Sequence, residues 1–258
     1  MNATSEPGKG QGQPSSSDTG DAAGQDELAV HMGELARALQ QEDTLQDTLQ
    51  GIVAAAVDTV PGAQYAGISE VKARREINTP AWTEEVVRAA DAAQYETGQG
   101  PCLDAVYAQQ TVRVSDMASD DRWPEFAKRA VELGVGSMLS FQLYVVGDNL
   151  GALNLYNRVP DAFDDESEHV GLLFASHAAV AMAGAQRNDQ LNRALGTRDL
   201  IGQAKGILME RHKLTADQAF MLLVRASQAT HTKLRDIAER LTTVGELLIL
   251  ENAPLGRE

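Results

Sequence analysis

The stretch from Thr197 to Thr243 reads TRDLIGQAKGILMERHKLTADQAFMLLVRASQATHTKLRDIAERLTT, and its charge is opposite in sign to that of the rest of the chain. Between Gly196 and Val244 the sequence has eight Lys or Arg residues against five Asp or Glu residues, a net charge of +3. The whole 258-residue chain carries −15, so the remainder carries −18. A basic segment joined to an acidic body is typical of a nucleic-acid-binding module attached to a regulatory part.

Apolar residues in this stretch recur at the 3–4 spacing of amphipathic helices and predict three helices. The first is expected over about residues 198–211, and a short third helix over about 233–241. Between them Thr215 and Gln218 have the spacing of a capping box, so the second helix is expected to begin there and to end near Ala229. The residues expected to face inward are Ile201, Ala204 and Leu208 in the first helix, Ala219, Phe220, Leu223 and Ser227 in the second, and Leu234, Ile237, Ala238 and Leu241 in the third.

A set of residues with defined spacing runs through the three predicted helices. It consists of Ile201, Ala204-Lys205-Gly206-Ile207-Leu208-Met209, Ala219-Phe220, Leu223, Arg225, Ser227 and Lys233-Leu234-Arg235-Asp236-Ile237-Ala238. In this order the set resembles the ANTAR domain of bacterial transcription antiterminators. The resemblance implies binding to paired RNA hairpins whose loops are read by two such domains, which prevents formation of a terminator hairpin. The chain departs from the family at His231, where the family usually has Asn, and at Ala229 and Thr232, where it often has a basic residue.

The polar residues of this stretch are the candidate RNA contacts. Lys and Arg can contact phosphates and Ser and His can meet base edges, while RNA sequence is read in loops and unstacked bases. For any one basic residue the alternative is that it only solvates its helix. Two other functions stay open: a DNA-binding transcriptional regulator, although helix-turn-helix spacing is usually shorter, and a protein-interaction adaptor whose basic helices meet an acidic partner. The candidates are Lys205, Arg211, Lys213, Arg225, Ser227, His231, Lys233 and Arg235.

The acidic remainder begins with residues 1–25, which are expected to form a disordered tail because they contain almost no large apolar side chains. No basic segment followed by an apolar run indicates a signal peptide. No apolar run of about 18 residues predicts a transmembrane helix. Cys102 is the single cysteine, which excludes an internal disulfide. Together these features predict a cytoplasmic protein that does not bind a membrane.

The pattern between residues 26 and 163 is a mixture of helices and strands. Alternating apolar and polar residues around Gly147-Asp148-Asn149 predict an antiparallel hairpin. After Pro160 a helix is expected to begin near Asp164 and to run into the basic stretch. The expected helices cover about residues 26–60, 84–94 and 125–133, and the expected strands cover about 65–71, 74–78, 112–114, 139–145 and 150–156.

Four short motifs accompany this pattern: Gly98-Gln99-Gly100-Pro101-Cys102-Leu103-Asp104, Asp120-Asp121-Arg122-Trp123-Pro124, Ser137-Met138-Leu139-Ser140 and Gly151-Ala152-Leu153-Asn154-Leu155-Tyr156. With a sheet flanked by helices and a hairpin before an exit helix, they resemble a GAF domain. The likeness is closest to actinobacterial-type proteins that pair GAF with ANTAR. It implies an α+β fold, a GAF-like antiparallel sheet flanked by helices followed by a long helix and a three-helix ANTAR bundle. It also implies a sensory module that binds a small ligand or reads redox state.

The residue types of this region restrict the chemistry of the sensor. No histidine lies between Met32 and Glu168, so a His-ligated haem or metal site in the ligand pocket is not expected, and no cofactor is predicted. With one Cys, no nucleophile elbow and no phosphate-cradling loop, no catalysis is expected. The pocket is expected on the sheet face between Gly62 and Pro160, and Cys102, Arg113 and Trp123 are the candidate ligand-binding residues. Their alternatives are a buried apolar cysteine, a surface ion pair and a core anchor.

The connecting helix contains a 3–4-spaced apolar series that suits a seam against another subunit. The alternative is that this series packs onto the chain's own sheet. Three helices in about 50 residues bury little apolar surface. The basic module is therefore expected to pack against this connecting helix or against a partner subunit. A homodimer is predicted. The predicted division is a tail at 1–25, a GAF-like sensor at 26–163, a coiled-coil-like connecting helix at 164–196, an ANTAR domain at 197–244 and a tail at 245–258. The series consists of Val170, Leu173, Phe174, His177, Val180, Ala181, Gly184 and Leu191.

Overall fold

A computed structural model of the chain describes residues 30, 32–72, 76–108 and 111–245. The chain divides into two compact units, Met1–Ala185 and Gln186–Glu258. The expected tail at 1–25 lies outside the described residues, and so does the expected tail at 245–258 except for Gly245. Among the helices of the described residues, none has the length and apolar character needed to cross a membrane.

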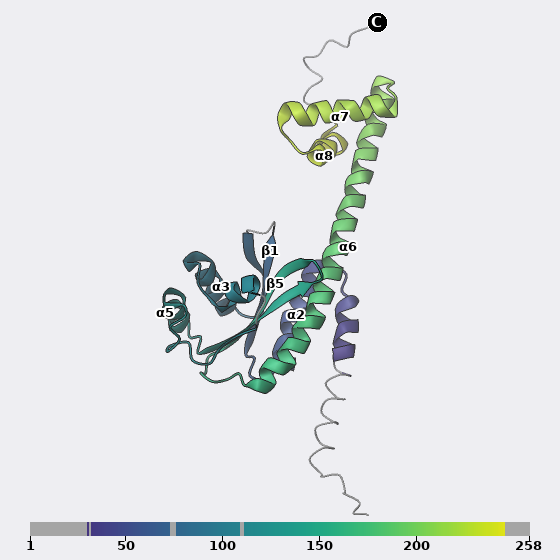
Figure 1. Cartoon of the computed structure of the whole chain (residues 1–258). Helices are drawn as coiled ribbons and strands as arrows, with labels where there is room; N and C mark the ends of the chain where they lie inside the picture. Colours follow the sequence, from purple (N-terminus) through teal and green to yellow (C-terminus); the bar gives the residue numbers. More distant parts are fainter. Residues whose placement is uncertain (1–29, 31, 73–75, 109–110, 246–258) are drawn as a thin grey trace, which may run out of the picture. The chain divides into compact units, whose positions relative to one another are not determined.

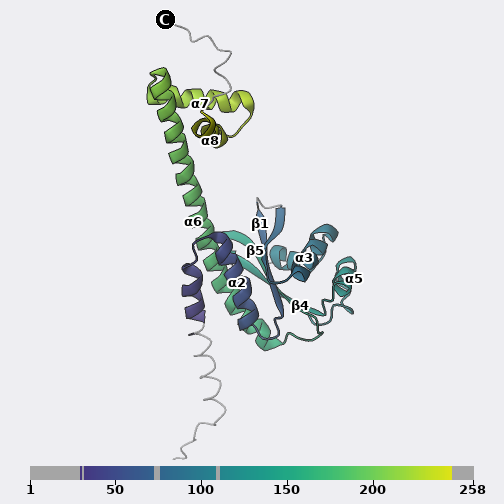
Figure 2. The ribbon, with the colours of Figure 1, turned by 180° about the vertical axis from the view of Figure 1, so that it is seen from behind.

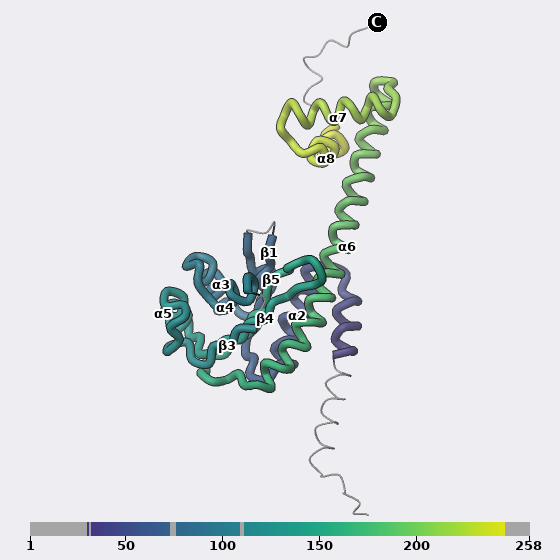
Figure 3. Tube along the Cα trace, viewed as in Figure 1, coloured from purple at the N-terminus to yellow at the C-terminus, as the bar shows by residue number. Residues whose placement is uncertain are grey.

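The first unit is built on a five-stranded sheet with the strand order β2-β1-β5-β4-β3, in which each neighbouring pair is antiparallel. Figure 3 labels β1, β5, β4 and β3 along the chain trace. The predicted hairpin is present, with Val145 paired to Asp148 at its turn and Ser137 paired to Asn157 at its base. The sheet and its helices confirm the α+β fold predicted from the sequence. The strands are β1 (Tyr65–Lys72), β2 (Glu76–Trp82), β3 (Val112–Val114), β4 (Ser137–Val145) and β5 (Asp148–Asn157).

Helices cover both faces of this sheet (Figures 1 and 2). One face packs against α2 (Leu45–Thr59) and the N-terminal part of α6 (Asp165–His212). The other face packs against α3 (Glu85–Thr97), α4 (Pro101–Ala108) and α5 (Pro124–Glu132). Alternation along β4 divides the core, because Leu139 and Phe141 face α2 and α6 whereas Met138 faces α3–α5.

Two expected elements have different bounds in the structure. Residues 32–40 are helical, but a new helix begins at Leu45 instead of one helix running to Val60. The break occurs because the Thr44 hydroxyl accepts a hydrogen bond from the Asp47 amide at 3.1 Å and caps α2. Strand β2 extends to Trp82 rather than ending near Asn78. It accommodates Pro80 because it is an edge strand, where one backbone face needs no donor.

The second unit contains the C-terminal part of α6, together with α7 (Ala216–Thr230) and α8 (Leu234–Val244). As predicted, α6 continues without a break into the basic stretch and Thr215 caps α7 through a capping box with Gln218. One prediction is wrong: Phe220 is 39% exposed and does not face inward. The core of the unit consists of Ala204, Leu208, Ala219, Leu223, Ala226, Ile237, Ala238 and Leu241.

Candidate functional site

Two of the candidate RNA contacts hold the turns of the second unit together. The Arg211 guanidinium donates a hydrogen bond to the carbonyl of Gly245, the residue that caps the C-terminus of α8. The Ser227 hydroxyl donates to the Thr232 carbonyl at 2.6 Å, across the turn between α7 and α8. Both side chains therefore have structural partners, and replacing either one changes the module's folding as well as its surface.

His231 and Lys213 have left-handed backbones. His231 caps the C-terminus of α7 with φ 52°, and Lys213 follows α6 with φ 53°. Asn tolerates this left-handed conformation better than most residues, so the backbone at His231 also suits the Asn that the ANTAR resemblance implies at this position. Lys213 also forms an exposed ion pair with Glu210 at 3.4 Å.

The remaining basic candidates lie on the surface of the unit. Arg225 projects from the exposed side of α7, Lys233 is the N-cap of α8, and Arg235 lies in the first turn of α8. Lys205 is half-buried, and its Nζ atom lies 6.0 Å from the centroid of the Phe220 ring. Phe220 was not among the candidates, because the periodicity of α7 does not distinguish a residue at the edge of the buried stripe from one inside it.

In the first unit, a buried polar network occupies the space between the sheet and α3. The Asp91 carboxylate on α3 accepts hydrogen bonds from Thr79 of β2 at 2.8 Å, from Asn154 of β5 at 3.3 Å and from the Tyr156 hydroxyl of β5. Removal of the carboxylate from water raises the pKa of Asp91 to about 6, although these hydrogen bonds oppose the shift. The network fills this part of the sheet face with protein groups.

Cys102 belongs to the same network. Its side chain is fully buried, and the thiol donates to the Ser69 hydroxyl at 3.1 Å. Burial, together with the nearby charge of Asp91, raises the pKa of the Cys102 thiol to about 12. A thiol in this environment stays protonated at neutral pH, which disfavours the thiolate chemistry of redox-sensing cysteines.

Arg113 and Trp123 have structural partners as well. The Arg113 guanidinium pairs with Asp165 at 2.9 Å and with Glu168 at 3.7 Å, which ties β3 to the start of α6. The Trp123 side chain is 5% exposed, and its indole N–H donates to Asp104 at 3.1 Å. The structure therefore does not bring Cys102, Arg113 and Trp123 together around one opening.

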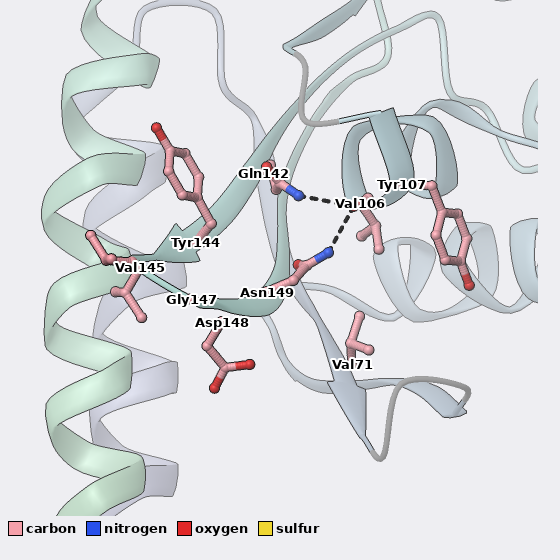
Figure 4. A pocket seen from close by; sticks show the side chains of 10 residues that line it. Val71, Val106, Tyr107, Gln142, Tyr144, Val145, Gly147, Asp148 and Asn149 are labelled. Carbon is pink, nitrogen blue, oxygen red and sulfur yellow. Dashed lines mark hydrogen bonds between the residues drawn. The ribbon is translucent and has the colours of Figure 1, made fainter.

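An open cleft of about 570 Å³ lies at the end of the sheet where β4 turns into β5 (Figure 4). The Gln142 and Asn149 side chains fix one wall, since each donates a hydrogen bond to the Val106 carbonyl of α4, at 2.9 and 2.8 Å. Tyr107 and Tyr144 are mostly exposed at its edges. In the part of the chain that the structure describes, Asp148 is the one charged side chain of the lining, which consists of Val71, Val106, Tyr107, Gln142, Tyr144, Val145, Val146, Gly147, Asp148 and Asn149.

Comparison with known proteins agrees with this arrangement. The GAF domain family matches residues 42–183, more than half of the chain, and the ANTAR domain family matches residues 189–241. No curated protein matches. Among solved structures, the GAF domain of a phosphoenolpyruvate-protein phosphotransferase from Coxiella burnetii is 16% identical, with 63% of this chain and 96% of that chain covered and a TM-score of 0.50. The corresponding domain from Acinetobacter is 15% identical, with 63% and 95% covered and a TM-score of 0.48.

The sheet, its two helical layers and the family match together define the first unit as a GAF domain, and the chain belongs to the GAF domain family. The second unit carries an ANTAR domain, so the chain is a GAF–ANTAR protein. This is the domain architecture of a regulator.

Proposed function

We propose that this chain is a signal-responsive RNA-binding regulator of transcription antitermination, in which the GAF domain controls an ANTAR domain that binds paired RNA hairpins. The observation that carries the proposal is the exposed basic surface of Arg225, Lys233 and Arg235 on a unit that matches the ANTAR family. Such side chains supply the phosphate contacts that dominate nucleic-acid affinity. This regulator acts in the cytoplasm on nascent RNA.

The proposed regulator works as a homodimer, because two hairpins need two reading modules. Only some residues of the apolar series on α6 are free to form a seam with another subunit. Val170 and Phe174 are buried in the chain's own core, whereas Leu173 and Val180 are 38% and 62% exposed. Packing Leu173 and Val180 against α6 of a second copy would remove their apolar surface from water, which favours a dimer.

The signal proposed for the GAF domain is a small molecule that binds in the cleft between α4 and the β4–β5 hairpin. Tyr107 and Tyr144 offer ring surfaces, and Asp148 offers a negative charge. Within the described lining the charged side chain is Asp148, so the proposed ligand is an uncharged or cationic ring compound rather than an anion. The proposed role is regulatory, and the buried Cys102 thiol, whose pKa burial raises to about 12, is not proposed to take part in it.

The RNA-binding proposal is tested by titrating the full chain against three probes of matched length: an RNA with two short hairpins, an RNA with one hairpin, and duplex DNA. We expect the order of affinity to be two hairpins, then one hairpin, then DNA. Tighter binding to duplex DNA would favour a DNA-binding regulator. Binding to none of the three would favour a protein-interaction adaptor.

The cleft is tested by a thermal-shift screen of neutral, cationic and anionic ring compounds. Stabilisation by a compound is expected to be lost in Tyr144→Ala and to persist in Tyr65→Ala, a half-buried tyrosine on β1 that does not line the cleft. Stabilisation by anionic compounds alone would contradict the proposed ligand chemistry.

A further inference from the structure

The second unit has an aromatic side chain at its surface. The buried positions of α7 are Ala219, Leu223 and Ala226, so the inward stripe is complete without Phe220. Phe220 lies next to that stripe and leaves 39% of its surface in contact with solvent. An exposed ring on a basic module offers a stacking surface for an unpaired base.

Phe220 forms one wall of a groove between α6 and α7. The groove has a volume of about 470 Å³, within the roughly 300–1,000 Å³ range of small-ligand sites. Gly202 of α6 also lines the groove, and an added Cβ there would have no heavy atom within 4 Å. Packing therefore does not require glycine at this position, yet its missing side chain leaves the groove open. The lining consists of Ala194, Thr197, Arg198, Ile201, Gly202, Lys205 and Phe220.

Two cations lie on the same wall of the groove. Arg198 and Lys205 are seven residues apart on α6, which places them two turns apart on one face of the helix. Lys205 Nζ lies 6.0 Å from the Phe220 ring centroid, within the range of a cation–π contact. Among the described residues, no acidic side chain lines the groove. The site thus combines one aromatic ring with two positive charges, which matches the base and the phosphates of a nucleotide.

We propose that this groove receives one unstacked base of the RNA hairpin loop, which stacks on Phe220 while Arg198 and Lys205 contact the phosphates on either side. The inference rests on the RNA-binding function proposed above and adds the site at which the loop is read. The inference predicts that RNA affinity depends on the shape of the groove as well as on the charge of the surface.

The test begins with hairpin RNAs selected by the full chain from a pool with randomised loops. Phe220→Leu keeps an apolar side chain but removes the ring, and we expect affinity for the selected RNA to fall roughly 5- to 150-fold, the range for loss of one base–aromatic stack. Phe220→Tyr keeps the ring and should bind as wild type. A 2-aminopurine placed at the stacked loop position should be quenched by wild type and not by Phe220→Leu.

Gly202→Met tests the groove without removing any contact of the folded protein, since methionine favours a helix over glycine and has open space there. We expect a loss of affinity comparable to that of Phe220→Leu. Gly196→Met is the matched control, because Gly196 is an exposed glycine of the same helix that has open space and does not line the groove.

The outcomes separate this inference from the function on which it rests. If RNAs are selected but Phe220→Leu and Gly202→Met bind them as wild type does, the base-binding groove is overturned and the RNA-binding function stands. If no RNA is selected above the level of the starting pool, both are overturned. Quenching of 2-aminopurine that does not depend on Phe220 would also overturn the groove.

Discussion

The Tyr156 hydroxyl donates a hydrogen bond to the buried carboxylate of Asp91, which links strand β5 to helix α3 inside the GAF domain. Thr79 and Asn154 donate to the same carboxylate from β2 and β5. Within the described residues, no Lys, Arg or His is recorded as a partner of Asp91, so neutral donors alone stabilise its charge. A buried carboxylate with neutral partners makes the stability of the domain sensitive to pH.

We expect Asp91→Asn to remove a pH-dependent part of the free energy of unfolding. The pKa of Asp91 is raised from 3.8 to about 6 in the folded protein, so the folded state holds the proton more tightly. The stabilising contribution of this group to the free energy of unfolding is therefore fully present below about pH 4 and is lost as the pH rises through about 6. A difference of about 2 pKa units corresponds to about 3 kcal/mol.

Urea unfolding at pH 4.5 and pH 7.5 checks this expectation. The unfolding free energy of wild type, measured relative to that of Asp91→Asn, should be lower at pH 7.5 than at pH 4.5. Asp58→Asn, on the exposed side of α2, is the control for the substitution itself. A difference between wild type and Asp91→Asn that does not change with pH would be incompatible with a raised pKa.

The thiol of Cys102 is expected to resist alkylation in the folded protein. It is fully buried with a pKa of about 12, and both properties suppress the thiolate that reacts. Iodoacetamide at pH 8 should label it at least about 100-fold more slowly than in urea. Ser176→Cys, made in a Cys102→Ala background, provides an exposed thiol on α6 for comparison. Equal labelling rates for Cys102 and this exposed thiol would restore a redox role.

Local patterns were sufficient to predict much of this structure. The alternation around Gly147 predicted the β4–β5 hairpin, and the spacing of Thr215 and Gln218 predicted the start of α7. The break before α2 was missed, because apolar periodicity continues across the Thr44 cap and hides it. Phe220 was placed inside because a period of 3.6 residues leaves the edge of a stripe ambiguous.

The candidate sites depend on contacts between residues far apart in the sequence, which no local sequence pattern can show. The Asp91 network includes hydrogen bonds between side chains up to 85 residues apart, as between Asn154 and Ser69, which meet only when the sheet forms. The cleft is likewise made by the end of α4 and the β4–β5 turn, and its wall depends on two amides that share the Val106 carbonyl. Cys102 was a natural candidate by residue type, but its environment is set by Ser69 on a distant strand.

Replacing His231 is expected to stabilise the ANTAR domain. This residue has φ 52°, a conformation in which a side chain with Cβ is strained and glycine is not. His231→Gly should raise the unfolding free energy by about 0.5–1 kcal/mol, and His231→Asn by less. Chemical unfolding followed by circular dichroism measures the change. Thr230→Gly, within α7, should have the opposite sign. A loss of RNA affinity above about tenfold in His231→Asn would mean that the imidazole itself contacts RNA.

Lys205, Arg225 and Lys233 are expected to contribute phosphate contacts. Replacing each with Ala should weaken RNA binding and reduce the slope of log affinity against log salt by roughly 0.7 per lost single-strand contact. Arg88→Ala, on α3 of the GAF domain, is the control for a lost charge elsewhere. Arg211→Ala should instead lower the stability of the module, since its guanidinium holds the Gly245 carbonyl. Unchanged slopes in all three variants would remove the electrostatic basis of the proposed function.

Assembly and RNA recognition are expected to be coupled through the exposed side of α6. Leu173→Asp and Val180→Asp place a charge at positions that are 38% and 62% exposed in the single chain, so the fold should tolerate them. In a helix seam the same charge is buried without a partner, at a cost of several kcal/mol. We therefore expect both variants to be folded monomers by sedimentation. Val131→Asp, at a 44% exposed position on α5, is the matched control and should leave the dimer intact.

The consequence for binding follows from the dimer's geometry. Two linked reading modules make the second hairpin contact intramolecular, which can raise avidity by about 10²–10⁴-fold without any new contact. A monomeric Leu173→Asp or Val180→Asp variant should lose this gain and bind a two-hairpin RNA no better than a single hairpin. The Val131→Asp control should keep the wild-type preference. A wild-type chain that sediments as a monomer and still prefers the two-hairpin RNA would show that pairing of the modules does not depend on α6.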